Sequence, residues 1–325
     1  MTLFPGVKLH VVTGKGGTGK TTVAAALALS LAQAGRQVLL TEAEGRQGIA
    51  QLFDTPPLPY EERRVAAAGG GEVYALAIDP EAALIEYLEK FYNLRRAGSA
   101  LKRIGAIDFA TTIAPGLRDV LLTGKVMEAA TRERRGGGRL YDAVVLDAPP
   151  TGRIARFLNV NAEVAGLARM GPIRQQADSV MNLLRSRQTA VHLVTLLEEM
   201  PVQETVDGVA ELEAAGLPVG AVLVNMVRAP MLPADQLDAA AAGRLDGAEI
   251  AAGLKRSGID ATDRLVAALA AEAAEHAGRV LLEAREREVL SALGRPRLEL
   301  PLLPDGADLS GLYDLAARLT EQGLS

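Results

Sequence analysis

A glycine-rich turn between two apolar segments constrains this chain most. Residues 10–24 read HVVTGKGGTGKTTVA, which is a strand-like run, a glycine- and lysine-rich turn, and an alanine-rich helix-like run. The pattern G-x-x-x-x-G-K-[ST] is met by Gly14, Gly19, Lys20 and Thr21. Backbone N–H groups in such a loop point inward, and the following helix contributes its positive dipole end. We therefore predict a P-loop that binds the phosphates of a nucleotide.

The P-loop predicts a role for each of its residues. Lys20 is expected to reach the β- and γ-phosphates, and the hydroxyl of Thr21 to bind Mg²⁺. ATP and Mg²⁺ are the expected cofactors. The residues expected to contact the nucleotide here are Gly16, Gly17, Thr18, Gly19, Lys20, Thr21 and Thr22.

Strand-like and helix-like segments alternate along the chain, which predicts an α/β fold with a doubly wound, mostly parallel sheet. The strand candidates are residues 8–13, 37–42, 72–78, 141–147, 190–196, 218–225 and 297–302. The helix candidates are 20–34, 80–94, 117–134, 201–215 and 262–293. Two stretches, about 80–134 and 159–189, exceed what a crossover needs. We expect them to be helical insertions within a single P-loop domain that spans residues 1–325.

Composition excludes several classes of function. Hydrophobic residues make up 49% of the chain, so a large core is expected. The absence of cysteine excludes disulfides, thiolate zinc sites and cysteine nucleophiles. A net charge of −5 argues against a broad nucleic-acid surface. The N-terminus does not resemble a signal peptide, and no apolar run is long enough to span a membrane, so we expect a cytoplasmic protein without an integral membrane span.

A second element of the expected site lies at residues 143–158, which read AVVLDAPPTGRIARFL. Asp147 ends an apolar strand, where its carboxylate can orient a water molecule bound to Mg²⁺. Gly152 can offer its N–H to the γ-phosphate because it has no Cβ in the way. These two residues are expected to sense the terminal phosphate.

Several motifs resemble those of the ArsA-like ATPases, the family of the arsenite-pump ATPase and of the ATPase that guides tail-anchored proteins to membranes. KGGTGKTT resembles the deviant Walker A motif of the wider MinD/ParA/ArsA class, and LDAPPTG followed by RFL resembles the family's switch II. Further resemblances lie at residues 75–87, 112–121, 190–205, 222–227 and 298–305. Segments 44–60 and 103–125 are most similar to one member of the paired ArsA-like ATPases of actinobacteria.

The resemblance implies roles that spacing alone does not establish. Lys15 would cross a dimer interface to the partner's phosphates. Asn225 would bind adenine, and the backbone of Pro301 and Leu302 would flank the base. The implied partner is a second copy or a related ATPase, in a homodimer or a heterodimer, and a protein client is a further implied partner.

Switch I departs from the family pattern. The family places an aspartate that positions the attacking water where this chain reads LTEAEGRQG at residues 40–48. Glu42 takes that place in an ungapped alignment, and Glu44 takes it if the register slips by two. Either carboxylate can accept a proton from water. Arg46 and Arg153 replace the asparagine of switch I and the histidine of switch II, so hydrolysis is expected to be slow or dependent on a partner.

Three functions are consistent with these observations. The first is a nucleotide-driven dimeric switch that handles or regulates protein clients, with Met170 and Met181 on an apolar face of the second insertion. The second is the energising subunit of an anion or metalloid pump, although the chain lacks the cysteines that would bind a soft metalloid. The third is a weakly catalytic nucleotide-binding partner subunit of a heterodimer.

Overall fold

The computed structural model describes residues 2–92, 115–167, 172–304 and 306–325. Within these residues, one eight-stranded sheet has the order β3-β4-β2-β5-β1-β6-β7-β8. All neighbouring strands are parallel except β3 and β4, which are antiparallel. The strands are β1 (Leu9–Gly14), β2 (Gln37–Glu42), β3 (Arg63–Ala68), β4 (Gly71–Ala77), β5 (Ala143–Asp147), β6 (Thr189–Thr195), β7 (Val219–Val227) and β8 (Arg297–Pro301). The predicted α/β fold class is confirmed.

The strands that the sequence predicted most clearly are those that are buried on both faces of the sheet. Strands β1, β5 and β6 are buried along their whole length, which explains their unbroken apolar sequences. The edge strand β3 was not predicted from the sequence. It carries exposed Arg63 and Arg64 and pairs with β4 through an irregular register, so it lacks the apolar run that identifies the central strands.

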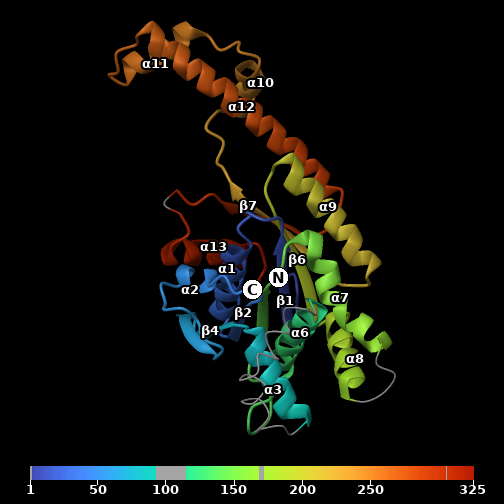
Figure 1. Cartoon of the computed structure of the whole chain (residues 1–325). Coiled ribbons are helices and arrows are strands. Elements are labelled where there is room, and N and C mark those ends of the chain that lie inside the picture. The colour runs from blue at the N-terminus through green and yellow to red at the C-terminus, as the bar shows by residue number, and fades with distance from the viewer. Residues whose placement is uncertain (1, 93–114, 168–171, 305) are drawn as a thin grey trace.

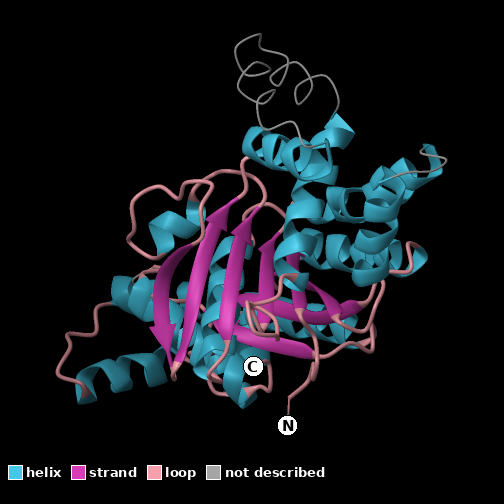
Figure 2. Cartoon of the chain, turned by 90° about the horizontal axis from the view of Figure 1, so that it is seen from below, coloured by secondary structure: helices cyan, strands magenta, loops and turns pink. Residues whose placement is uncertain are grey.

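Helices cover both faces of the sheet (Figures 1 and 2). One face holds α1 (Lys20–Gln33), α2 (Gly48–Leu52) and α13 (Leu309–Glu321). The other holds α6 (Pro115–Thr131), α7 (Thr151–Leu167), α8 (Pro172–Leu184) and α9 (Glu199–Ala214), with α3 (Pro80–Tyr92) beside α6. Alanine-rich α1 is almost entirely buried between the sheet and α13. The small side chains therefore allow close packing of this layer.

A helical arm connects β7 to β8. It consists of α10 (Ala234–Ala241), α11 (Gly247–Arg256) and the long α12 (Asp263–Ser291). Figure 1 shows α10, α11 and the first part of α12 extending away from the sheet, whereas the end of α12 packs beside α9. Of the helices in this arm, the sequence predicted only α12 and missed α10 and α11. Elsewhere in the chain it also missed α2 and α13.

The helix boundaries agree with the capping signals. Asp79 accepts a hydrogen bond of 2.7 Å from the N–H of Ala82, and α3 begins at Pro80. Gly294 adopts φ 62° shortly after α12 ends. Part of the first predicted insertion (93–114) and Met170 of the second lie outside the described residues. In the described part of the chain, none of the helices combines the length and hydrophobicity needed to cross a bilayer.

Candidate nucleotide and magnesium site

The P-loop connects β1 to α1 in a conformation that depends on glycine. Gly14, Gly17 and Gly19 all have positive φ angles, of 156°, 89° and 83°. A Cβ on Gly14 would collide with the carbonyl oxygen of Val194. Gly19 is the left-handed N-cap of α1. The loop therefore packs tightly against the sheet on one side.

The outer side of the loop is open. A Cβ on Gly16 or Gly17 would meet nothing within 4 Å. Lys20 and Thr22, on the first turn of α1, are half-buried, and no acidic side chain lies in that turn. This exposed backbone and the positive end of α1 are available to phosphates, as a phosphate cradle requires.

Thr21 at the start of α1 meets Asp147, and Glu42 lies next to Asp147 at the carboxyl ends of β2 and β5. The hydroxyl of Thr21 donates a hydrogen bond of 2.6 Å to Oδ2 of Asp147. Glu42 and Asp147 end the neighbouring strands β2 and β5 and face each other in the register. Both carboxylates are buried, with 2% and 6% of their surface exposed. The structure thus brings together the two predicted Mg²⁺ residues and one predicted catalytic carboxylate.

The electrostatics of Asp147 are unusual for an aspartate. Burial raises its pKa to about 6. The hydrogen bond from Thr21 and the charge of Lys20 lower this pKa, whereas the nearby Glu42 and Glu44 raise it further. A nearby cation would offset the free-energy cost of burying this negative charge.

Two oxygen atoms of this cluster lack partners. Oδ1 of Asp147 and Oε2 of Glu42 are buried and accept no hydrogen bond from any described group. Carboxylate and hydroxyl oxygens suit Mg²⁺, which keeps several waters and binds through few protein ligands. Within the described residues, no three histidine, cysteine or acidic side chains gather into a metal site made of protein alone. These residues therefore fit a Mg²⁺ ion whose remaining ligands are water and phosphate.

The two candidates for positioning water differ in their surroundings. Glu42 accepts only a long bond of 3.4 Å from the N–H of Gly48. Glu44 is partly exposed and forms a 3.3 Å ion pair with Arg46. Gly152 lies exposed in the first turn of α7, and a Cβ there would meet nothing within 4 Å. Glu42 is thus the buried carboxylate beside the candidate metal residues.

Lys15 contacts an acidic residue of its own chain. Its ammonium lies 2.9 Å from Oε1 of Glu204 on α9. The other oxygen of Glu204 accepts a hydrogen bond of 3.5 Å from Thr151 at the start of α7. Sequence reasoning did not identify Glu204, although it lies in the segment 190–205 that resembles the family.

Asn225 packs directly behind the P-loop. Its Nδ2 donates a hydrogen bond of 2.9 Å to the carbonyl of Thr18, and a Cβ on Gly19 would collide with the same atom. Pro301 and Leu302 follow at the end of β8 and are exposed, and the N–H of Leu302 donates to the carbonyl of Val227 at 2.9 Å. The predicted nucleotide residues therefore lie in the P-loop, in the first turns of α1 and α7, and near the carboxyl ends of β7 and β8.

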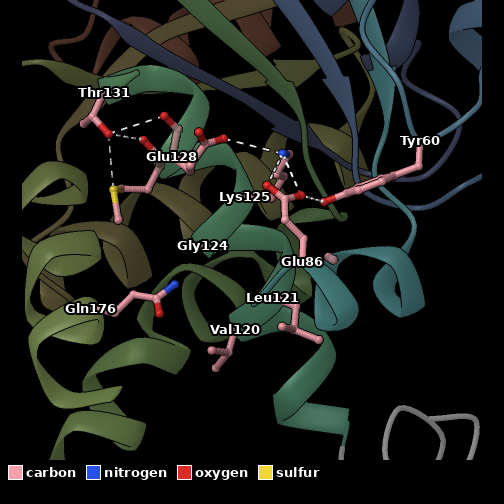
Figure 3. Close-up of a pocket in the computed structure, with 11 residues that line it drawn as sticks. Tyr60, Glu86, Val120, Leu121, Gly124, Lys125, Glu128, Thr131 and Gln176 are labelled. Atoms are coloured by element: carbon pink, nitrogen blue, oxygen red, sulfur yellow. Dashed lines mark hydrogen bonds and ion pairs between the residues drawn. The ribbon is translucent and has the colours of Figure 1, made fainter. Parts of the chain in front are cut away.

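A separate cavity lies among α3, α6 and α8 (Figure 3). Its apolar side includes Val120 and Leu121, and its polar side is built on the ammonium of Lys125, whose side chain is 12% exposed. Lys125 lies 2.9 Å from both oxygens of Glu86, which also accepts a 2.6 Å hydrogen bond from Tyr60. None of the P-loop residues lines this cavity.

Comparison with known proteins agrees with the motifs. The family model described as anion-transporting ATPase matches residues 7–187. ATPase BagA of Mycobacterium tuberculosis (strain ATCC 25618 / H37Rv) is 56% identical over 320 residues, which are 98% of this chain and 94% of that protein. ATPase GET3 of Kluyveromyces lactis is 30% identical over 196 residues, 58% of this chain and 55% of that protein.

A third relative matches almost the whole chain. An arsenical pump-driving ATPase of Acidiphilium multivorum is 28% identical over 338 residues, which are 96% of this chain and 54% of that protein. The family match begins before β1 and extends past α8, so it includes the P-loop and both switch segments. The chain therefore belongs to the anion-transporting ATPase family, the ArsA-like P-loop ATPases, and is an ATP hydrolase.

Proposed function

We propose that this chain is a Mg²⁺-dependent, ATP-driven dimeric switch that acts on protein clients in the cytoplasm. The observation that carries the proposal is the pair of buried, unpartnered carboxylate oxygens on Asp147 and Glu42 beside the P-loop. These atoms lie at the carboxyl edge of the sheet, where α/β folds bind ligands. A bound Mg²⁺ would neutralise charge on the β- and γ-phosphates.

Each residue around this site has a distinct proposed role in phosphoryl transfer. Lys20 and the backbone N–H groups of the P-loop hold the phosphates, and Thr21 and Asp147 hold the metal directly or through water. Glu42 orients the attacking water, because it is buried next to Asp147 while Glu44 is paired with Arg46. Gly152 offers its N–H to the terminal phosphate at the start of switch II.

The role of Glu42 is testable against that of Glu44. Glu42→Gln should lower single-turnover ATP hydrolysis by about 100-fold or more, as expected for loss of a general base. Glu44→Gln, which removes a partly exposed carboxylate, should change it by less than about threefold. ATP binding, measured by calorimetry with Mg²⁺, should persist in both variants. The reverse ranking of the two rates would assign the water to Glu44.

The proposed dimer depends on Lys15. A second cation delivered by a partner subunit stabilises charge in phosphoryl transfer, as an arginine finger does. In this structure the ammonium is held by Glu204, so it must leave that ion pair to reach a partner's phosphates. We propose that ATP draws two subunits together and that Lys15 exchanges Glu204 for phosphate.

This exchange predicts opposite effects for the two partners of the ion pair. Lys15→Ala should abolish ATP-dependent dimerisation and lower turnover by about 10³-fold, as loss of an arginine finger does. Glu204→Gln should keep or increase dimerisation, because it frees Lys15. Sedimentation with a slowly hydrolysed ATP analogue measures both. A Lys15→Ala protein that dimerises and hydrolyses normally would remove the crossing lysine from the mechanism, and mixing with a related ATPase would show whether the dimer is mixed.

The cavity in Figure 3 favours a protein client over a pumped anion. Apolar side chains of Ala83, Val120, Leu121 and Met127 line it together with the Lys125 ion cluster. An apolar side chain of a client would fit here, whereas a bare anion would face apolar groups. Val120→Asp, at a half-buried position of the lining, should abolish nucleotide-dependent binding of a fluorescent apolar peptide and leave ATP binding intact. If the variant bound the peptide as the wild type does, the result would instead favour the pump-subunit or partner-subunit function.

A further inference from the structure

A second pocket lies between the two switch segments and the helical layer. Its walls come from the loop after β2, from the first turns of α6 and α7, and from the proline-rich end of β5. The pocket has a volume of about 110 Å³. The residues that line it are Ala43, Glu44, Arg46, Arg118, Asp119, Leu122, Pro149 and Arg153. None of them belongs to the P-loop, and neither Glu42 nor Asp147 is among them.

Three guanidinium groups from three different segments meet at this pocket. Arg46 comes from switch I, Arg118 from α6 and Arg153 from switch II. Arg46 forms a long ion pair with Glu44. No described acidic side chain forms an ion pair with Arg118 or Arg153. Two of the three fork-shaped donor groups therefore have their hydrogen-bonding capacity available to a ligand.

The charge balance of the pocket is positive. The three arginines outnumber the two carboxylates in the lining, Glu44 and Asp119. Half-buried Asp119 lies within electrostatic reach of Arg118 and Arg153, whose charges lower its pKa, although burial raises that pKa more. Arg118 and Arg153 also lie in the first turns of α6 and α7, where the helix dipoles are positive. The pocket thus favours a negatively charged occupant.

We propose that this pocket binds a small oxyanion, a phosphate- or carboxylate-bearing metabolite, next to the position proposed for the terminal phosphate of the nucleotide. Arginine binds such groups through two parallel N–H···O bonds, which gives both strength and orientation. Because the pocket joins switch I, switch II and α6, a bound oxyanion contacts both segments that respond to the nucleotide. The site stands whether or not the chain forms the proposed dimeric switch.

The test separates this site from the P-loop, which also attracts phosphate. Inorganic phosphate is titrated calorimetrically into the nucleotide-free Lys20→Ala protein, in which the P-loop lysine is absent. We expect saturable binding of one phosphate. Adding Arg118→Gln should weaken that binding about tenfold or more, as loss of hydrogen bonds to a charged group does. Arg285→Gln, at an exposed position on α12, is the matched control and should leave phosphate affinity unchanged.

Each outcome decides the proposal. Absence of phosphate binding to the Lys20→Ala protein, or equal affinities with and without Arg118→Gln, would overturn it. Arg153→Gln provides a second variant on another helix, and it should reproduce the loss. Circular dichroism melting confirms that each variant is folded. Because Lys20→Ala is expected to have no ATPase activity, retained phosphate binding in that protein would support the pocket even if the dimeric switch failed.

Discussion

The most constrained residue of the candidate site is Asp147. Its carboxylate is buried next to Glu42, so two negative charges share one wall of the site in the absence of a cation. Burial is the main cause of its raised pKa, and the hydrogen bond from Thr21 only partly offsets this effect. The free energy of burying this charge is therefore an unfavourable term in the stability of the nucleotide-free protein.

Asp147→Asn should accordingly stabilise the nucleotide-free protein while it abolishes Mg²⁺-dependent hydrolysis. The folded-state pKa of about 6 lies above the ordinary value of 3.8. At pH 7.5 the substitution removes this penalty, and the free energy of unfolding should rise by about 1–3 kcal/mol. Urea unfolding measures this change. A variant less stable than the wild type would show that the carboxylate makes favourable contacts that outweigh its burial.

The same pKa predicts how Mg²⁺·ATP binding depends on pH. Above pH 6 Asp147 is ionised and available to the metal, whereas below pH 6 its proton competes with Mg²⁺. Affinity for Mg²⁺·ATP should fall as pH is lowered from 7 to 5, by up to about tenfold per unit below the pKa. Calorimetry of the wild type and of Asp147→Asn at several pH values measures this; the variant should lack the Asp147-dependent part of the decrease.

At the scale of secondary structure, the junction of β1 and α1 determines the geometry of the phosphate cradle. Gly19 adopts a left-handed conformation because the chain must turn there into the first turn of α1. Asn225 of β7 fills the space where a side chain at position 19 would lie. Asn225 on β7 thus supports the inner side of the loop, and the loop is open only on its outer side.

Gly19→Ala should therefore distort the cradle. The new Cβ would be strained by the positive φ and would displace the amide of Asn225 from the carbonyl of Thr18. We expect nucleotide affinity to fall by about 10-fold or more, with a loss of stability of about 1–3 kcal/mol. Gly278→Ala, on α12 and outside the P-loop, is the matched control, because its Cβ would meet open space. Equal nucleotide affinities in the two variants would contradict the steric argument.

The elements that the sequence predicted share an apolar pattern, and two of those that it missed, β3 and α11, do not. The helix α13 was also missed, although Leu312, Leu315 and Leu319 are buried at helical spacing. Buried parallel strands such as β1 and β5 have unbroken apolar sequences, and the P-loop glycines have a fixed spacing. The strand β3 carries exposed arginines, and α11 has none of its residues buried, so neither shows the periodicity of a core element. The Lys15–Glu204 pair joins residues far apart in sequence, which no local pattern indicates.

At the scale of the whole molecule, two histidines lie in the centre of the sheet. His192 on β6 accepts a hydrogen bond from the N–H of Ala221 through Nδ1, so its Nε2 carries the proton and donates to Nδ1 of His10 at 3.1 Å. The rings are stacked, with Phe4 packed edge-on against His192. Burial lowers the pKa of His192 to about 3 and also lowers that of His10. Both rings are therefore neutral in the folded protein.

This pair should make the fold sensitive to acid. Above pH 6.5 both states carry neutral histidines and the pair has no effect on pH dependence. Below pH 6.5 only the unfolded state takes up the protons, so each histidine lowers the free energy of unfolding by about 1.4 kcal/mol per pH unit. In His192→Asn, whose Oδ1 can still accept from Ala221, the decrease in the free energy of unfolding between pH 6 and pH 5 should be smaller than in the wild type by about 1.4 kcal/mol. Urea unfolding at these pH values would refute the prediction if the two decreases were equal.

The strand order also affects how the protein forms during synthesis. The P-loop strand β1 lies between β5 and β6, which begin only at Ala143 and Thr189. The backbone groups of β1 therefore cannot pair with either neighbouring strand until those later residues have left the ribosome. Such distant pairings slow folding and leave apolar strands exposed to aggregation. An N-terminal fragment that ends before β5 should consequently need a chaperone to remain in solution.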